Sequence, residues 1–188
     1  EKTIQKDVKR VIEVLSNIRY EWEILVVVDG CNDKTYEKAK RLVNSKVSVY
    51  RFIKNHGKGQ AVRYGMRKAK GDYVLFLDSG MEIDPNGISM LLEHFEWYDA
   101  DIIVGSKRHP VSVVKYPLDR TILSFGYYWL VRLLFGINVK DTQPGIKIFK
   151  KEVLVKVLPL LKVKRYAFDI ELLSVAHSLG FKRIFEAP

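Results

Sequence analysis

The stretch YVLFLDSGMEIDP, residues 73–85, runs from a continuous apolar segment into a turn that carries three acids. The apolar run from Tyr73 to Leu77 is typical of a buried strand, and Asp78 ends it just before a Ser-Gly turn. Glu82 and Asp84 follow. One interpretation is an ordinary strand, turn and helix in which Asp84 caps the helix. The other is a metal and phosphate site at the carboxyl edge of a sheet.

The rest of the chain repeats this alternation of apolar strands and amphipathic helices. Near-continuous apolar strands between such helices predict an α/β fold of three layers, with a mostly parallel sheet covered on both faces. We expect one domain over residues 1–188, truncated at both ends, because a helix leads the chain where this class begins with a strand. Strands are expected at residues 23–29, 47–53, 72–78 and 100–106, and helices at 4–18, 33–43, 59–69 and 86–97.

Polar and charged residues gather after each expected strand. In open α/β sheets, ligands bind at the carboxyl ends of the strands. Those ends here are Asp29-Gly30, residues 55–59, residues 78–80 and residues 105–108. The pattern therefore predicts a ligand site along a single edge of the sheet.

Each of these motifs also has a purely structural interpretation. Asp29 could accept hydrogen bonds from a base or ribose, or simply belong to a turn. Lys58 lies between two glycines at a helix start, where backbone N–H groups and an ammonium could bind a phosphate. An ordinary glycine-rich turn explains that segment about as well. The cations after the fourth strand, Lys107 and later Arg120, could neutralise phosphates or form a solvated loop.

Composition narrows the class of partner. The net charge of +10 favours a polyanion, such as an anionic membrane surface or a phosphorylated small molecule, although a generally basic surface is the alternative. No helix-turn-helix or RNA-binding signature accompanies the charge, so we expect no nucleic acid. The single cysteine, Cys31, fits a reducing compartment. Residues 121–139 are apolar but contain Arg132, which favours a packed or interfacial helix over a membrane span.

Together these segments resemble the inverting nucleotide-sugar glycosyltransferases of the GT-A type. EKTI (residues 1–4) resembles the helix start that follows the family's first strand, VVVDGCNDKT (26–35) its nucleotide loop, and NHGKGQAVRYG (55–65) its Asn-x-Gly-Lys-Gly-x-Ala segment. GSKRHP (105–110), DTQPGIKIF (141–149) and RYAFDIELL (165–173) are similar to the polyprenyl-phosphate branch, which includes dolichyl-phosphate mannose synthases and dolichyl-phosphate glucosyltransferases.

The resemblance implies a role for each matching residue. Asp29 and Lys58 would bind the nucleotide and its phosphates, and Asp78 and Glu82 would hold Mg²⁺ or Mn²⁺ on the sugar diphosphate. Lys107, Arg120 and Ser124 would bind the phosphates of the donor and the acceptor. Ser124 would belong to the residues that bind the nucleotide sugar. Asp169 and Glu171 would lie near the sugar or the acceptor. The catalytic set is then Asp78, Lys107, Arg120 and Asp169.

The implied reaction is transfer of glucose or mannose, from UDP-glucose or GDP-mannose, to a polyprenyl or dolichyl phosphate, with inversion and metal assistance. The enzyme would act at the cytoplasmic face of a membrane, peripherally or anchored. Two alternatives are a related transferase that acts on a saccharide hydroxyl, and a nucleotide-sugar-binding domain without catalysis. The second arises because Gly80 stands where the family's Asp-x-Asp motif has its second acid.

Overall fold

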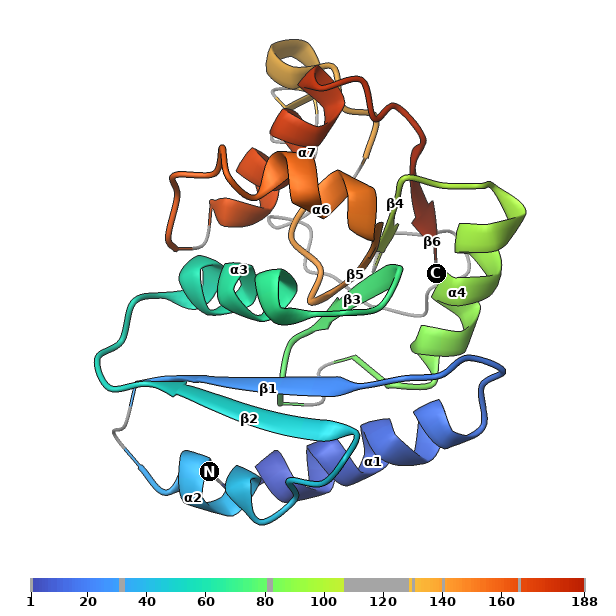
Figure 1. Ribbon diagram of the computed structural model, residues 1–188. Helices are drawn as coiled ribbons and strands as arrows, with labels where there is room; N and C mark the ends of the chain where they lie inside the picture. The colour runs from blue at the N-terminus through green and yellow to red at the C-terminus, as the bar shows by residue number, and fades with distance from the viewer. Residues whose placement is uncertain are drawn as a thin grey trace, which may run out of the picture.

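The computed structural model describes residues 2–30, 33–80, 83–106, 129, 131–139, 141–165 and 167–187. Strands form a central layer, and helices cover it on both sides (Figure 1). This confirms the predicted three-layer α/β architecture. In the described part of the chain, no helix combines the length and the apolar character needed to cross a membrane.

The elements predicted in the first half of the chain are present, with ends shifted by a few residues. Their apolar periodicity reflects real burial, since the apolar residues of α1 and α4 contribute to the core. The strands are β1 (Ile24–Asp29), β2 (Val47–Phe52), β3 (Tyr73–Leu77) and β4 (Ile102–Gly105), and the helices are α1 (Ile4–Ser16), α2 (Thr35–Lys40), α3 (Lys58–Lys68) and α4 (Gly87–Trp97).

The second half adds a strand that runs against the others. β5 (Ile146–Lys150) pairs with both β3 and β4 in antiparallel fashion, so it lies between two strands that precede it in the chain. Helices α6 (Lys151–Val157) and α7 (Phe168–Ser178) follow, and β6 (Ile184–Ala187) returns to pair with β4 in parallel. The sheet that contains these strands is therefore mixed rather than wholly parallel.

The described strands form two separate sheets. β1 and β2 pair in parallel, and the second sheet has the order β3-β5-β4-β6. Among the described strands, β1 has no partner besides β2, and β3 has none besides β5. The sequence predicted β1 and β3 in one sheet. In the structure they belong to two sheets, and each has one edge without a partner among the described strands.

Two apolar layers lie on either side of the second sheet. Alternate residues of β4 point to opposite faces, as a strand requires. Ile102 and Val104 pack with α6 and α7, whereas Ile103 packs with α4. A third cluster, under β1 and β2, contains Ile4 and Val8 of α1.

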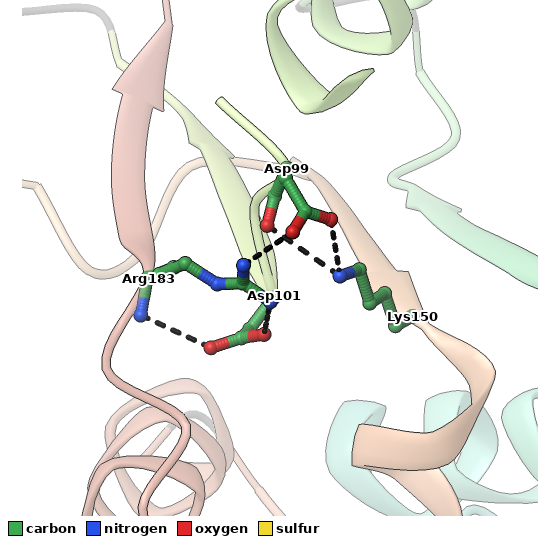
Figure 2. A network of polar contacts seen from close by, with 4 residues as sticks. All are labelled: Asp99, Asp101, Lys150 and Arg183. Carbon is green, nitrogen blue, oxygen red and sulfur yellow. Dashed lines mark hydrogen bonds and ion pairs between the residues drawn. The ribbon is translucent and has the colours of Figure 1, made fainter. Parts of the chain in front are cut away.

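A network of charged side chains fixes the amino end of β4 and β6 (Figure 2). Asp101 accepts the backbone N–H of Arg183 at 3.0 Å and its Nη2 at 3.1 Å. Asp99 pairs with the same arginine and with Lys150. The hydrogen bond from Lys150 is the main reason why the pKa of the Asp99 carboxyl lies below its ordinary value. This network lies at the sheet edge opposite to the predicted ligand site.

Candidate functional site

An ion pair joins the carboxyl end of β3 to the start of α3. Asp78 directly follows β3, and Lys58 is the first residue of α3. The Nζ atom of Lys58 donates to Oδ2 of Asp78 at 2.7 Å. The Lys58 side chain is 25% exposed and that of Asp78 is 41% exposed, so a ligand can reach both charges. The two motifs that the sequence placed at one edge therefore meet there.

The Asp29 carboxylate shapes the loop that leads into α3. Its Oδ1 accepts the backbone N–H of His56 and its Oδ2 that of Gly57, each at 2.7 Å. A carboxylate offers about four lone-pair positions, so Asp29 keeps acceptor capacity for a ligand hydroxyl. Gly57 has a φ of 95°, and a Cβ there would meet the carbonyl oxygen of Lys164 at 2.7 Å. Only glycine fits this turn, which places Lys58 beside Asp78.

A buried ion pair lies behind Lys58. Lys147 on β5 and Asp169 on α7 are both almost fully buried, and the Lys147 Nζ donates to Asp169 Oδ1 at 2.6 Å. Asp169 Oδ2 also lies 3.9 Å from the Lys58 Nζ. Four alternating charges therefore run from the core to the surface in the order Lys147, Asp169, Lys58 and Asp78.

Burial acts strongly on the innermost of these charges. Desolvation lowers the pKa of the Lys147 ammonium below its ordinary value, although the neighbouring Asp169 favours the charged form. The carbonyl oxygen of Pro144 accepts a further hydrogen bond from Lys147 Nζ at 2.8 Å. Lys147 thus ties β5, the segment before it and α7 together.

Gly145 holds the Asp78 carboxylate in place from the other side. The Asp78 N–H donates to the Gly145 carbonyl oxygen at 2.7 Å. A Cβ on Gly145 would lie 2.7 Å from Asp78 Oδ2, the oxygen that Lys58 contacts. Any side chain at position 145 would therefore displace that carboxylate.

The structure brings together four of the residues predicted for the site, and it also describes Glu171. Asp29, Lys58, Asp78 and Asp169 lie around the start of α3. Their functional roles stay predictions. Four further predictions lie outside the described residues, namely Glu82, Lys107, Arg120 and Ser124.

Two residues of the later motifs have structural contacts that the sequence did not indicate. Glu171 accepts the backbone N–H groups of Lys162 and Val163 at 2.8 and 2.9 Å, so its carboxylate anchors the loop before α7. Lys147 was not predicted for the site. Its position within the DTQPGIKIF motif was the available signal, because a lysine in an otherwise apolar strand needs a buried partner.

The described residues fit a divalent ion that arrives with a diphosphate. Mg²⁺ bound to phosphates takes one or two carboxylates and completes its shell with phosphate oxygens and water. Asp78 can supply one carboxylate. No group of three or more Asp, Glu, His or Cys side chains in the described ranges could form a full protein cage. Gly80 has a φ of 110°, a conformation that an acid at this position would adopt only with strain.

Comparison with known proteins places the chain among nucleotide-sugar enzymes. Residues 1–158 match the sequence profile of glycosyl transferase family 2. The chain is 36% identical over 171 residues to a dolichyl-phosphate beta-glucosyltransferase of Drosophila melanogaster, covering 85% of this chain and 52% of the relative. It is 31% identical over 174 residues to the protein of the same name from Dictyostelium discoideum, covering 87% of this chain and 53% of the relative. The chain thus spans about half the length of these curated relatives.

The fold is that of solved GT-A enzymes. Glucosyl-3-phosphoglycerate synthase from Mycobacterium tuberculosis superposes with a TM-score of 0.69 at 18% identity, covering 96% of this chain and 64% of that one. That structure is a complex with Mn²⁺, uridine-diphosphate-glucose and phosphoglyceric acid. At this level of identity the likeness establishes the fold and confirms the expected fold class.

The buried pair of Lys147 and Asp169 predicts a specific pattern of stability. Lys147→Met removes the buried partner of Asp169 and leaves only the more distant Lys58, at 3.9 Å, so the free energy of unfolding should fall by up to about 3–5 kcal/mol. Lys147→Met combined with Asp169→Leu removes both charges and should recover most of this loss. Urea denaturation of the single and double variants measures both effects. A double variant no more stable than Lys147→Met would contradict the pairing.

Proposed function

Because the chain belongs to glycosyl transferase family 2, we propose that it carries the catalytic site of an enzyme that transfers a hexose from a nucleotide sugar to a polyprenyl phosphate, with inversion. The observation that supports this most is the meeting of Asp29, Lys58 and Asp78 at the carboxyl edge of the strands. Acceptor oxygens, an ammonium and a carboxylate are what a nucleoside diphosphate and its metal require.

The donor would lie along this edge with its diphosphate at Lys58. That ammonium is held between two carboxylates, and contact with phosphate oxygens would replace part of this pairing. Asp78 would then bind the divalent ion, whose chemistry is to neutralise the charge that develops on the departing diphosphate. The free carboxylate positions of Asp29 would accept ribose hydroxyls. Lys147 would hold Asp169 beside Lys58, and Asp169 stays the residue expected near the sugar or the acceptor.

The acceptor chemistry requires little of the protein. A lipid phosphate is already anionic near neutral pH, so no residue needs to remove a proton from it before attack. Catalysis then depends on orienting the two phosphates and on stabilising the leaving group. Lys107, Arg120 and Ser124 are proposed to bind the acceptor and donor phosphates, and Glu82 to assist Asp78.

Glucose is the sugar we propose, with UDP-glucose as the donor. Relatives from insect, slime mould and human are named dolichyl-phosphate beta-glucosyltransferases. The fold neighbour from Mycobacterium tuberculosis was solved with UDP-glucose and Mn²⁺. Mg²⁺ and Mn²⁺ are both suitable, since Asp78, the carboxylate that the described residues offer, is an oxygen ligand that either ion accepts.

A membrane surface is the proposed setting for the acceptor. The helical residues at 131–135 include Leu133, which is 83% exposed, Leu134, which is 62% exposed, and Phe135. Trp129 nearby is also exposed and stacks with the Arg132 guanidinium. Exposed apolar side chains beside a cation suit the interface of an anionic bilayer. The cytoplasmic face is proposed because the single cysteine fits a reducing compartment.

Replacement of one carboxylate tests the proposed chemistry. Asp78→Asn keeps the size of the side chain but removes its charge, so the rate of glucose transfer should fall by about 100-fold or more. Asp84→Asn is the matched control, because Asp84 follows in the same segment and pairs with Arg10 at the surface. Transfer from labelled UDP-glucose to a short polyprenyl phosphate, with Mn²⁺, measures both. Equal rates for the two variants would refute the role of Asp78.

The membrane proposal is tested separately. Replacing Leu133 and Leu134 together by Ser removes two exposed apolar side chains and should weaken binding to anionic liposomes by about tenfold or more. Val155→Ser with Leu160→Ser is the control, since both are exposed apolar residues that lie outside the 129–135 segment. Sedimentation with liposomes of phosphatidylserine and phosphatidylcholine gives the bound fraction. The same loss in both double variants would argue against a specific docking surface.

A further inference from the structure

The Lys58 ammonium occupies the carboxylate that the proposed metal needs. Its Nζ donates to Asp78 Oδ2 at 2.7 Å, and the Lys58 side chain is only 25% exposed. Solvent ions screen such a partly buried pair less than a fully exposed one. The pair lies at a cavity of about 960 Å³ between the two sheets, which Lys58 and Asp78 both line. A bare divalent ion that reaches Asp78 therefore meets a carboxylate whose charge is already neutralised.

The Asp78 side chain is packed in place, so the carboxylate cannot easily turn away from the lysine. The Gly145 position lies against it, since a Cβ there would come within 2.9 Å of the Asp78 Cβ and 2.7 Å of its Oδ2. The hydrogen bond from the Asp78 N–H to the Gly145 carbonyl oxygen fixes the backbone at the same place. Any exchange of cations at Asp78 must therefore come from movement of Lys58.

The four charges that include this pair balance one another. Two lysines and two aspartates form two ammonium–carboxylate pairs, Lys147 with Asp169 and Lys58 with Asp78. A divalent ion added at Asp78 alone would place two positive charges beside the Lys58 ammonium, and like charges at such short range repel in a partly buried site. A diphosphate changes this balance, because its oxygens bring negative charge for both cations.

Lys58 has a second carboxylate within reach. Asp169 Oδ2 lies 3.9 Å from the Lys58 Nζ, whereas Lys147 contacts the other oxygen, Oδ1, at 2.6 Å. A shift of the Lys58 Nζ by about 1 Å would bring it to hydrogen-bond distance of Asp169. The Phe76 ring centroid lies 5.1 Å from the Lys58 Nζ, and its attraction for a cation favours the same location. The ammonium can thus leave Asp78 and keep partners for its charge.

We infer that Lys58 is a displaceable counter-ion, which neutralises Asp78 until a diphosphate binds and then moves to Asp169 and the phosphate oxygens. This inference rests on the nucleotide-sugar site proposed above and adds the order in which its ligands bind. A divalent ion binds to Asp78 together with the diphosphate and only weakly before it. Lys58 is in this sense a positioning residue, since it acts on the metal through Asp78.

Binding of Mn²⁺ without nucleotide tests the first half of the inference. Lys58→Met keeps the length of the side chain and removes its charge, so the affinity for Mn²⁺ alone should rise by about tenfold or more. Lys58→Arg keeps the charge and should leave that affinity low. Lys68→Met is the matched control, because Lys68 lies at the other end of α3. The electron paramagnetic resonance signal of free Mn²⁺ measures all four proteins.

The gain must also depend on Asp78. Lys58→Met combined with Asp78→Asn should bind Mn²⁺ alone no better than the unmodified chain, because the carboxylate that the lysine had neutralised is then gone. A gain that persists in the double variant would mean that Mn²⁺ binds elsewhere, and it would overturn the inference.

Calorimetric titration with UDP tests the second half. In the unmodified chain, Mn²⁺ should tighten UDP binding by about 100-fold, since the diphosphate displaces Lys58 and the metal then binds both. In Lys58→Met this tightening should be about tenfold smaller, because the metal no longer has to wait for the nucleotide. The same tightening in both proteins would contradict an exchange at Lys58.

The unmodified chain gives an independent readout that needs no variant to fold. The carboxyl ¹³C signal of Asp78 should stay in place with millimolar Mg²⁺ alone and should shift when UDP is added. A shift with Mg²⁺ alone, or equal Mn²⁺ affinities of the unmodified chain and Lys58→Met, would overturn the exchange while UDP binding still supports the proposed function. Absence of UDP binding in every protein would refute the proposed function and the exchange together.

Discussion

The Lys58–Asp78 ion pair is the contact on which the arrangement of the site depends. It links the end of β3 to the start of α3, so it forms only when α3 packs beside the strand that follows it in the chain. Asp29 supports it by fixing the loop before Lys58, and Gly145 supports it by leaving room for the Asp78 carboxylate. The charges are held in place by backbone geometry, so they are available before a ligand arrives.

The buried part of the charge chain explains why an exposed ion pair can be so well positioned. A surface salt bridge alone contributes about 0–1 kcal/mol and rarely fixes a side chain. Here Lys58 also faces Asp169, which is anchored in the core by Lys147. The site is thus connected to β5 and α7. Both elements come after residues 107–128, the segment that carries the predicted phosphate-binding residues Lys107 and Arg120. Family membership agrees with a nucleotide-sugar site at this edge.

Much of the fold was predictable because its signals are local. The apolar runs of β1 and β3, and the polar residues that end them, gave the strands and the ligand edge. The position of Asp29, Lys58 and Asp78 at a common edge could be predicted because the carboxyl ends of parallel strands meet at one edge of a sheet. The antiparallel direction of β5 was not predictable, since IKIFK is equally compatible with either direction and its partners are distant in sequence. The burial of Lys147 depends on Asp169, which lies on a later helix.

The separation of the two sheets was also beyond local patterns. Leu25 and Leu75 line the cavity, but apolar residues are equally typical of strands that pack in a single sheet, so the sequence of β1 and β3 does not reveal the cavity. The site and the cavity share Asp29, Lys58 and Asp78 as lining residues.

The central claim is that a nucleoside diphosphate binds at the carboxyl edge, and a ¹⁵N NMR titration with UDP and Mg²⁺ tests it most directly. The account predicts that the amide signals of Gly57, Lys58 and Gly145 shift, and that they shift less without the metal. Signals around Asp99 and Arg183, at the opposite edge, should stay in place. Shifts confined to that opposite edge, or no shifts at millimolar UDP, would contradict the account.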